Sequence, residues 1–300
     1  MNYDIVIIGC GVSGMTAAIY ALRSDKSVLI LEKESIGGAI ASSPKIENYP
    51  GYQKISGAEL ADNLYEQVIS LGGVIELEEV TEIKVGNEKE VITTDNIYTC
   101  KAIIIATGSK YKLLGLPNET DLIGNGVHFC VSCDGAFYKD KIVGVIGGGN
   151  TAITNALTLS EICKKVYIIQ NLSDLTGEKL LKEKLKEKKN VEIYYESTVK
   201  ELKKDDELKG ITIDYKGKNK DIKLDGIFVS IGQVPETNFI KNIINLNEYN
   251  YVLSDSECKT NIKGVFVSGD VRDKKIRQLT TATNDGTISA IEAVNYIDSL

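Results

Sequence analysis

The sequence predicts an α/β protein of two Rossmann-like (three-layer ββα) domains, with the second domain inserted into the first. Two observations predict this class: apolar runs of strand length alternate with helical segments, and one unit of strand, glycine-rich turn and helix occurs twice. Pro117 and Pro235 interrupt the alternation and suggest domain boundaries. We therefore expect a discontinuous first domain of residues 1–114 and 243–300, and an inserted domain of residues 115–242.

The elements follow in order along the chain. A strand at 5–8 leads through glycines into a helix at 12–23, and a second strand follows at 27–31. Leucines and valine recur at helical spacing between Leu60 and Leu71, which predicts a helix with one buried face. Further strands are expected at 80–85, 91–94, 101–106, 143–146, 165–169, 191–195, 211–215, 226–231 and 265–268, and further helices at 150–160, 179–189 and 283–297.

Composition and charge exclude several classes of protein. The chain has 300 residues, of which 43% are hydrophobic and 26% charged, as is typical of globular proteins. The net charge of -7 gives no general attraction to nucleic acid or to an anionic membrane. No apolar run approaches the roughly 20 residues that span a bilayer, and the N-terminus lacks the basic start of a signal peptide. We expect a cytoplasmic protein that binds neither nucleic acid nor membrane.

The first glycine-rich turn has the pattern of a dinucleotide site. Gly9, Gly11 and Gly14 follow the first strand directly. In such a turn the first glycine permits the bend, the second lets a pyrophosphate approach the backbone, and the third lets helix and strand pack closely. The helix that follows offers free N–H groups to the phosphates. Glu32 ends the next strand, near the spacing of about 20 residues at which a carboxylate reads a ribose diol.

The second turn, from Gly147 to Ala152, lacks a comparable residue for the ribose. Gln170 stands where the first copy has Glu32, and no Lys or Arg occurs from Gln170 to Glu178. A 2′-phosphate needs a cationic partner, and a free 2′-hydroxyl is usually read by an acid. The glycines of the turn are nevertheless intact, so the pattern leaves open whether it binds a nucleotide.

Cys130 and Cys133 form the chemically distinctive pair among six cysteines. Their spacing suits a disulfide or a metal site, but a zinc ribbon normally needs a second such pair, which the chain lacks. We therefore expect redox chemistry and no metal. Asp134 follows the second thiol, where it either moves a proton during thiol–disulfide exchange or serves as a turn residue. His128 either tunes a thiolate or faces away from the pair.

These motifs together resemble the low-molecular-weight thioredoxin reductases, over the whole chain and in order. The resemblance implies that the first glycine turn holds FAD, and that Cys130 and Cys133 carry electrons from the flavin to the disulfide of thioredoxin with Asp134 as acid and base. It also implies a homodimer. The implied FAD-binding residues are Gly9, Gly11, Val12, Ser13, Gly14, Glu32, Lys33, Gly38, Asn48, Ala106, Thr107, Gly108, Gly269, Asp270, Arg277, Gln278 and Leu279.

One segment departs from the NADPH-dependent members of that family. They carry a basic His-Arg-Arg-x-x-x-Arg motif, and the corresponding stretch here, around residues 167–174, holds none of those cations. In this respect the chain resembles the ferredoxin-dependent flavin thioredoxin reductases, which implies reduced ferredoxin as the electron donor. Two alternatives remain at this point: NADH or NADPH as the donor, and a redox-sensing flavoprotein without enzymatic turnover.

Overall fold

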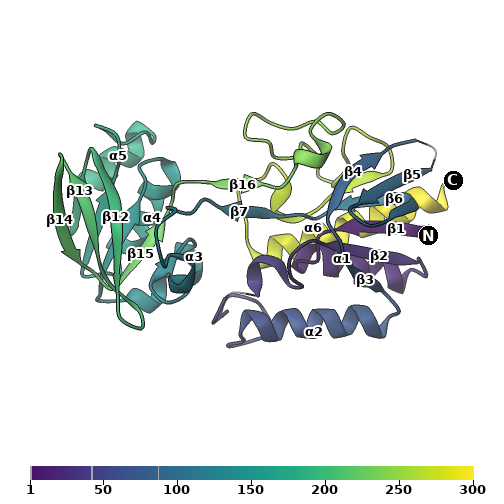
Figure 1. Cartoon of the computed structure of the whole chain (residues 1–300), viewed down its shortest axis with the longest axis horizontal. Helices are drawn as coiled ribbons and strands as arrows, with labels where there is room; N and C mark the ends of the chain where they lie inside the picture. The colour runs from purple at the N-terminus through teal and green to yellow at the C-terminus, as the bar shows by residue number, and fades with distance from the viewer. Residues whose placement is uncertain (1, 42, 87) are drawn as a thin grey trace. The chain divides into compact units, whose positions relative to one another are not determined.

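The chain divides into two compact units (Figure 1). The computed structural model describes residues 2–41, 43–86 and 88–300. Unit 1 comprises Met1–Lys110 and Val234–Leu300, and unit 2 comprises Tyr111–Gln233. The two segments that link the units pair with each other, because β7 (Ser109–Tyr111) and β16 (Gln233–Pro235) form a small sheet.

The unit boundaries differ from the residue numbers expected from the sequence. The return to unit 1 comes at Val234 rather than at residue 243. The short helix η4 (Asn238–Ile240) and the turn after it already belong to the core of unit 1, since Ile240 and Ile244 are buried in it. Pro235 is the last residue of β16, so this proline lies within the segment that connects unit 2 back to unit 1.

A central sheet organises unit 1. Its strand order is β3-β2-β1-β6-β5-β4, with β17 also paired to β6. The pairs made by β1, β2, β3 and β17 are parallel, whereas β4, β5 and β6 pair antiparallel. The strands are β1 (Asn2–Ile8), β2 (Val28–Glu32), β3 (Val74–Leu77), β4 (Val80–Lys84), β5 (Lys89–Thr93), β6 (Ile97–Ile105) and β17 (Val265–Val267).

Both faces of this sheet are covered, which gives three layers (Figure 1). Alternate residues of β1 point to opposite cores: Ile5 and Ile7 pack against helices, and Val6 and Ile8 lie in the core that includes β4 and β5. This alternation explains why the strand is apolar throughout. The helices of the unit are α1 (Val12–Arg23), α2 (Gly57–Ser70) and α6 (Leu279–Asp298), with short 3-10 turns η1 (Gly38–Ile40) and η5 (Gly269–Val271).

Unit 2 repeats this plan on a smaller scale. Its parallel sheet has the order β11-β10-β9-β15-β8, and the antiparallel meander β12-β13-β14 packs on one face of it. Helix α4 packs on the other face. The elements are β8 (Val127–His128), α3 (Val131–Asp134), β9 (Ile142–Ile146), α4 (Asn150–Ser160), β10 (Lys165–Ile169), α5 (Lys179–Lys186), β11 (Val191–Tyr194), β12 (Ser197–Lys204), β13 (Leu208–Tyr215), β14 (Lys218–Lys223) and β15 (Gly226–Val229), with the turns η2 (Thr120–Leu122) and η3 (Gly135–Tyr138).

The predicted fold class is confirmed: each unit is an α/β structure of the three-layer ββα type. The last helix, however, begins at Leu279 rather than at residue 283. Gln278 caps it, with reciprocal hydrogen bonds between Gln278 and Thr281 that close its first turn. In the helix expected over 179–189, Leu185 is buried but Leu180 is 61% exposed. Within the described residues, no helix combines the length and the apolar character that a membrane crossing requires.

Candidate functional site

The first glycine turn is packed tightly except at one point. A Cβ on Gly9 would lie 2.4 Å from the carbonyl oxygen of Ala106, and one on Gly14 would lie 2.0 Å from the carbonyl oxygen of Gly9. A Cβ on Gly11 would meet no described atom within 4 Å. The open backbone therefore lies at Gly11, directly before α1, whose first N–H groups have no partner inside the helix. This is the geometry that lets a pyrophosphate approach.

Glu32 is fixed beside this turn by backbone donors. Its Oε2 accepts a hydrogen bond from the N–H of Cys10 at 2.8 Å, and its Oε1 accepts one from the N–H of Glu34 at 2.9 Å. Gly38 also adjoins the turn, because a Cβ there would lie 3.2 Å from the Cα of Gly11. The carboxylate keeps further lone pairs that a ribose diol can use.

The Lys33 side chain is held by acidic neighbours. Its Nζ pairs with Glu236 and lies 3.9 Å from a carboxylate oxygen of Glu79. Thr107 reaches the same region, since its Oγ1 donates to the backbone oxygen of Glu236 at 2.9 Å. Ala106, the residue before it, donates its N–H to the oxygen of Ile8 at 2.8 Å. The segment of Ala106, Thr107 and Gly108 thus runs along the end of β1.

Asp270 is a half-buried carboxylate with one enclosed oxygen. Its Oδ1 lies 3.3 Å from the Nζ of Lys274 but accepts no hydrogen bond from the described part of the chain. Burial raises the pKa of this carboxyl group, and the Lys274 charge opposes that rise. Gly269, just before it, has φ of +77° and lies against Ser13 of α1. A hydroxyl-rich ligand at the start of α1 would satisfy the Asp270 oxygen.

The remaining predicted FAD-binding residues also lie in unit 1. The Asn48 amide donates to the side-chain oxygen of Gln278 at 3.3 Å. The Arg277 guanidinium lies 4.2 Å from the centre of the Tyr251 ring and donates to the backbone oxygen of Asp270 at 3.3 Å. Leu279 packs in a small core that includes Val12. The structure thus places Glu32, Gly38, Ala106 and Gly269 against the first glycine turn or the start of α1, and joins Asn48 to Gln278 and Arg277 to Asp270 within the same unit.

In unit 2, Cys130 and Cys133 form a disulfide. Cys130 precedes α3, and its carbonyl oxygen accepts hydrogen bonds from the N–H groups of Cys133 at 3.2 Å and Asp134 at 3.0 Å. This single helical turn brings the two Cα atoms to 5.3 Å, and Cys133 is exposed. Among the described residues, no cluster of three or more His, Cys, Asp or Glu could hold a metal ion. The pair is accordingly an accessible redox disulfide.

His128 also lies at this site. The sequence alone left open whether it does. Its ring lies against the carboxylate of Asp134, with Nδ1 and Oδ2 separated by 3.2 Å. A parallel pairing of β8 with β15 sets His128 opposite Phe228 and holds it in the interior. The position of His128 two residues before Cys130 was the available signal, but the contact goes to Asp134 rather than to a sulfur.

At the second glycine turn, side chains from the segment 170–178 lie against the backbone. A Cβ on Gly148 would lie 2.4 Å from the side chain of Gln170, which is buried and donates to the oxygen of Asp174 at 3.0 Å. Asn150, the first residue of α4, donates from its amide to a carboxylate oxygen of Glu178 at 3.1 Å. An anionic side chain thus occupies the surroundings of a helix N-terminus that phosphate would favour.

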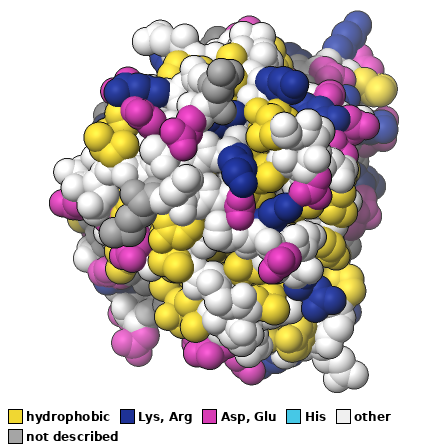
Figure 2. Space-filling model, turned by 90° about the vertical axis from the view of Figure 1, so that its right-hand side faces the viewer, with side chains coloured by type: hydrophobic (Ala, Val, Ile, Leu, Met, Phe, Trp, Pro, Cys, Tyr) yellow, Lys and Arg dark blue, Asp and Glu magenta, His cyan; other side chains and the backbone are white. Residues whose placement is uncertain are grey.

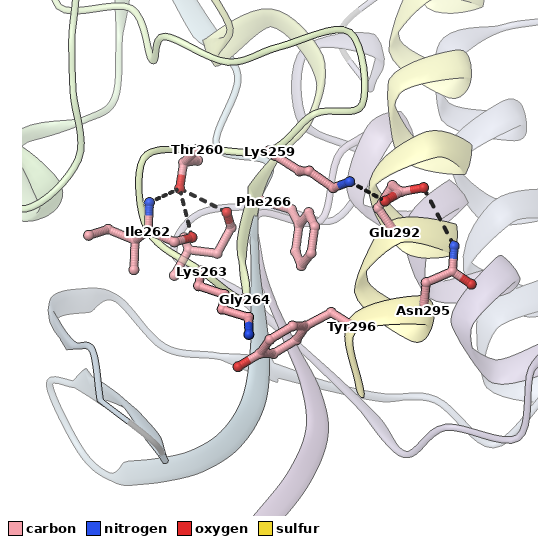
Figure 3. Close-up of a pocket in the computed structure, with 10 residues that line it drawn as sticks. Lys259, Thr260, Ile262, Lys263, Gly264, Phe266, Glu292, Asn295 and Tyr296 are labelled. Carbon is pink, nitrogen blue, oxygen red and sulfur yellow. Dashed lines mark hydrogen bonds and ion pairs between the residues drawn. The ribbon is translucent and has the colours of Figure 1, made fainter. Parts of the chain in front are cut away.

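A separate hollow of unit 1 involves none of the predicted site residues (Figure 3). Its volume is about 370 Å³. Lys259 pairs there with Glu292 at 2.7 Å, and the Asn295 amide donates to Glu292 at 3.5 Å, so these polar groups bind one another. The face seen in Figure 2 carries basic, acidic and apolar side chains interspersed, rather than a continuous basic area. Neither feature adds to the site.

A dinucleotide turn in one unit and a redox disulfide in the other define a disulfide oxidoreductase. The chain belongs to the pyridine nucleotide-disulphide oxidoreductase family, whose model matches residues 3–286. It is 42% identical over 298 residues to a protein of Clostridium pasteurianum named "34.2 kDa protein in rubredoxin operon", an alignment that covers 98% of this chain and 97% of that protein. It is 35% identical over 302 residues to the thioredoxin reductase of Bacillus subtilis, covering 99% of this chain and 96% of that protein.

Solved structures show the same likeness. A thioredoxin reductase from Streptococcus pyogenes has a TM-score of 0.96 and 37% identity, covering 100% of this chain and 99% of that one. A ferredoxin-flavin thioredoxin reductase from Clostridium acetobutylicum has a TM-score of 0.55 and 27% identity, covering 100% and 99%. The resemblance to the low-molecular-weight thioredoxin reductases is therefore confirmed.

The cofactor of the chain is FAD. The residues present fit it: the backbone is open at Gly11, the Glu32 carboxylate stands at the ribose position of the motif, and the enclosed Oδ1 of Asp270 accepts no hydrogen bond from the described residues. We expect these three residues, with the predicted segments around them, to hold the adenosine, pyrophosphate and ribityl parts of FAD.

Proposed function

We propose that the chain is a thioredoxin reductase that passes electrons through FAD and the Cys130–Cys133 pair to the disulfide of thioredoxin. The observation that carries the proposal is the accessible disulfide of unit 2 with a carboxylate, Asp134, on the same helical turn. The full-length similarity to proteins named thioredoxin reductase supports thioredoxin as the substrate.

The chemistry at the pair needs two thiols and one proton carrier. When bound, FAD would supply the two electrons that, with two protons, convert the disulfide into the thiols of Cys130 and Cys133. One thiol gives up its proton, and its thiolate attacks a sulfur of thioredoxin, so that the thioredoxin disulfide breaks and a mixed disulfide forms. The second enzyme thiol then gives up its proton, and its thiolate attacks the enzyme sulfur of that mixed disulfide. The Cys130–Cys133 bond forms again, and thioredoxin leaves with two electrons and two protons.

Asp134 has the position of the proton carrier in this exchange. It follows Cys133 directly and is partly exposed, with 19% of its side chain accessible. As a carboxylate it accepts a proton from an enzyme thiol, and as a carboxylic acid it donates that proton to the thiolate that leaves. We therefore assign Cys130, Cys133 and Asp134 as the catalytic residues of the proposed reaction.

We further propose that reduced ferredoxin, rather than NADH or NADPH, is the electron donor. The side chains at the second glycine turn support this. Gln170 lies against Gly148, where a Cβ would come within 2.4 Å of the Gln170 amide, and that amide donates to the oxygen of Asp174 at 3.0 Å. Thr176 is tied to the second turn, because its N–H donates to the oxygen of Gly148 at 2.8 Å.

Charge favours the same conclusion. The segment from Gln170 to Glu178 holds no Lys or Arg of its own for a nucleotide 2′-phosphate. Lys182 of α5 reaches the segment, but its Nζ is bound to Asp174 at 2.7 Å and to the oxygen of Leu175 at 3.1 Å. The other phosphates would approach the Glu178 carboxylate beside α4. Each missing charge-assisted hydrogen bond is worth about 1.5 to 3 kcal/mol. Two of them correspond to a loss of roughly a hundredfold or more in affinity for NADPH. NADH gains nothing in exchange, since Gln170 replaces the acid that reads a free ribose diol.

Turnover of thioredoxin by the holoenzyme tests the proposed function. Purified protein with bound FAD is mixed with oxidised thioredoxin and, in parallel, with reduced ferredoxin, NADPH or NADH. We expect thioredoxin thiols to appear with ferredoxin, and Cys130→Ser and Cys133→Ser to abolish turnover while keeping FAD. Rapid turnover with a nucleotide would replace the proposed donor and keep the substrate. Bound FAD that is reduced without any turnover of thioredoxin would favour the redox-sensor alternative.

Assembly and location form part of the same proposal. The family resemblance supports a homodimer, for which sedimentation equilibrium should give about twice the chain mass of 32.8 kDa. Cys10, Cys100, Cys163 and Cys258 are buried free thiols, a cysteine usage compatible with a reducing compartment such as the cytoplasm. A mass of one chain at working concentration would contradict the dimer.

A further inference from the structure

His128 joins two titratable side chains inside unit 2. Its Nδ1 lies 3.2 Å from Oδ2 of Asp134, and its Nε2 lies 2.7 Å from the Oη of Tyr138. The imidazole is 6% exposed and Tyr138 is 7% exposed, so both rings are shielded from water. The result is a continuous contact from a buried phenol, through a buried imidazole, to the carboxylate that adjoins Cys133.

Packing fixes the direction of the imidazole. The ring of Phe228 on β15 stacks on it with centroids 5.4 Å apart, and the ring of Tyr138 meets it edge-on at 5.2 Å. Tyr138 is itself confined, because a Cβ at Gly226 would lie 2.4 Å from its ring. Glycine at that position of β15 leaves the space that the phenol fills. The two ring nitrogens of His128 are therefore directed to their partners by the fold.

The phenol faces one nitrogen of the imidazole, and the carboxylate faces the other. Burial raises the pKa of Tyr138, and the charges of Asp134, Glu207 and Asp225 raise it further, so the phenol keeps its O–H. The Nζ of Lys141 lies 5.1 Å from the centre of the same ring. An O–H donated to Nε2 of His128 would leave Nδ1 as the protonated nitrogen, on the side of Asp134.

This arrangement of contacts suits a carboxylate that must gain and lose a proton. The imidazole lies against Oδ2 of Asp134, with Nδ1 at 3.2 Å, so Oδ1 is the oxygen left to exchange the proton. Without that contact, Asp134 would stand at the end of a four-residue helix, α3, with its side-chain torsions free to vary. A second element, β8, supplies the group that fixes them.

We propose that His128 is a positioning residue that aims Asp134 at the thiol pair, and that Tyr138 sets the imidazole tautomer. The inference rests on the proposed thioredoxin reductase function, since it concerns the proton transfer of that reaction. His128 touches neither sulfur in this role, and it acts through Asp134.

Two isosteric variants separate the contacts of the imidazole. In His128→Asn the amide nitrogen replaces Nδ1 and keeps a donor to Asp134, whereas in His128→Gln it replaces Nε2 and keeps only the contact to Tyr138. The measurement is a single turnover: protein reduced with dithiothreitol, freed of the reductant, is mixed with oxidised thioredoxin across the neutral and mildly alkaline pH range. Circular dichroism and bound FAD report folding of each variant.

We expect His128→Gln to slow the exchange by about tenfold to a hundredfold, the effect of losing one polar contact to a charged group, and to move the acidic limb of the pH profile upward. His128→Asn should stay within a few-fold of the wild type with its pH profile retained. In an Asp134→Asn background, His128→Gln should add no further loss. Tyr138→Phe, which removes one oxygen from the core, should show a smaller shift of the profile in the same direction.

Other outcomes would overturn the inference. If the folded His128→Gln and His128→Asn variants exchange with thioredoxin at the same rate, His128 does not position Asp134. The same holds if both are slowed equally and keep the wild-type pH profile, and in either case His128 only packs in the core. A full loss from His128→Gln in the Asp134→Asn background would show that it does not act through Asp134. If wild-type dithiol fails to reduce thioredoxin, the proposed function fails, and the same comparison with hydroxyethyl disulfide still decides the role of His128.

Discussion

Gly11 is the residue at which one added side chain separates cofactor binding from folding. Because a Cβ there would meet no described protein atom within 4 Å, Gly11→Val should leave the protein folded and without FAD. Gly14→Ala is the matched control, since its Cβ would lie 2.0 Å from the oxygen of Gly9 and should destabilise the fold itself. The measurements are the flavin absorbance of the purified proteins and urea unfolding of the apoproteins. A yellow Gly11→Val protein would contradict the placement of the pyrophosphate.

Asp270 illustrates at the same scale how a site residue costs stability. Burial raises the pKa of its carboxyl group above the ordinary value of 3.8. A raised pKa in the folded state contributes stability that is present below the ordinary value and lost as the pH rises through the folded one. Asp270→Asn should therefore stabilise the apoprotein at neutral pH, with little effect under acidic conditions, and weaken FAD binding.

Urea unfolding of the two apoproteins at acidic and neutral pH checks this, together with titration of each with FAD. The difference in unfolding free energy between Asp270→Asn and wild type should grow with pH. If it is constant, or if the variant binds FAD as tightly as wild type, Asp270 is a structural residue rather than a ligand for the cofactor.

At the scale of elements, the segment 170–178 decides what the second glycine turn can bind. Introducing arginines at Asn171, Leu172 and Thr176 adds cations to the segment, which holds none of its own. We expect Asn171→Arg, Leu172→Arg and Thr176→Arg together to raise the affinity for 2′,5′-ADP by roughly a hundredfold, the value of two charge-assisted contacts.

Isothermal titration of wild type and variant with 2′,5′-ADP and with 5′-AMP measures this. The gain in affinity should appear with 2′,5′-ADP and not with 5′-AMP. A variant with lysine at the same three positions should gain less affinity for 2′,5′-ADP, because Lys lacks the bidentate geometry of Arg. Tight binding of 2′,5′-ADP by the wild type would show that the turn already reads the 2′-phosphate without cations.

Elements were predictable from the sequence where their pattern was local. The apolar run of β1 and the glycines after it locate the first turn, and the alternation of buried residues follows from the period of a strand. The predicted start of α6 at residue 283 was wrong. Thr280 and Thr281 do not continue the apolar period, and the capping role of Gln278 cannot be recognised from residue spacing. The polar strands of the meander, such as β14, carry too few apolar residues to be recognised.

At the scale of the whole molecule, the predicted residues divide between the units. Every residue expected at the FAD site lies in unit 1, and the redox pair with Asp134 lies in unit 2. The resemblance supplied this list, whereas no sequence pattern indicates the contacts that join distant positions. Asn150 and Glu178 are an example, and so are His128 and Tyr138, whose rings meet because of β8, β15 and η3.

The electron donor is the central claim of the proposed function, and anaerobic stopped-flow mixing tests it most directly. Oxidised holoenzyme is mixed in separate experiments with reduced ferredoxin, NADPH and NADH, and the loss of flavin absorbance is followed in each. We predict rapid bleaching with ferredoxin and no bleaching at a catalytically useful rate with micromolar NADPH or NADH. Fast bleaching by either nucleotide would contradict the account and make the protein a nucleotide-dependent thioredoxin reductase.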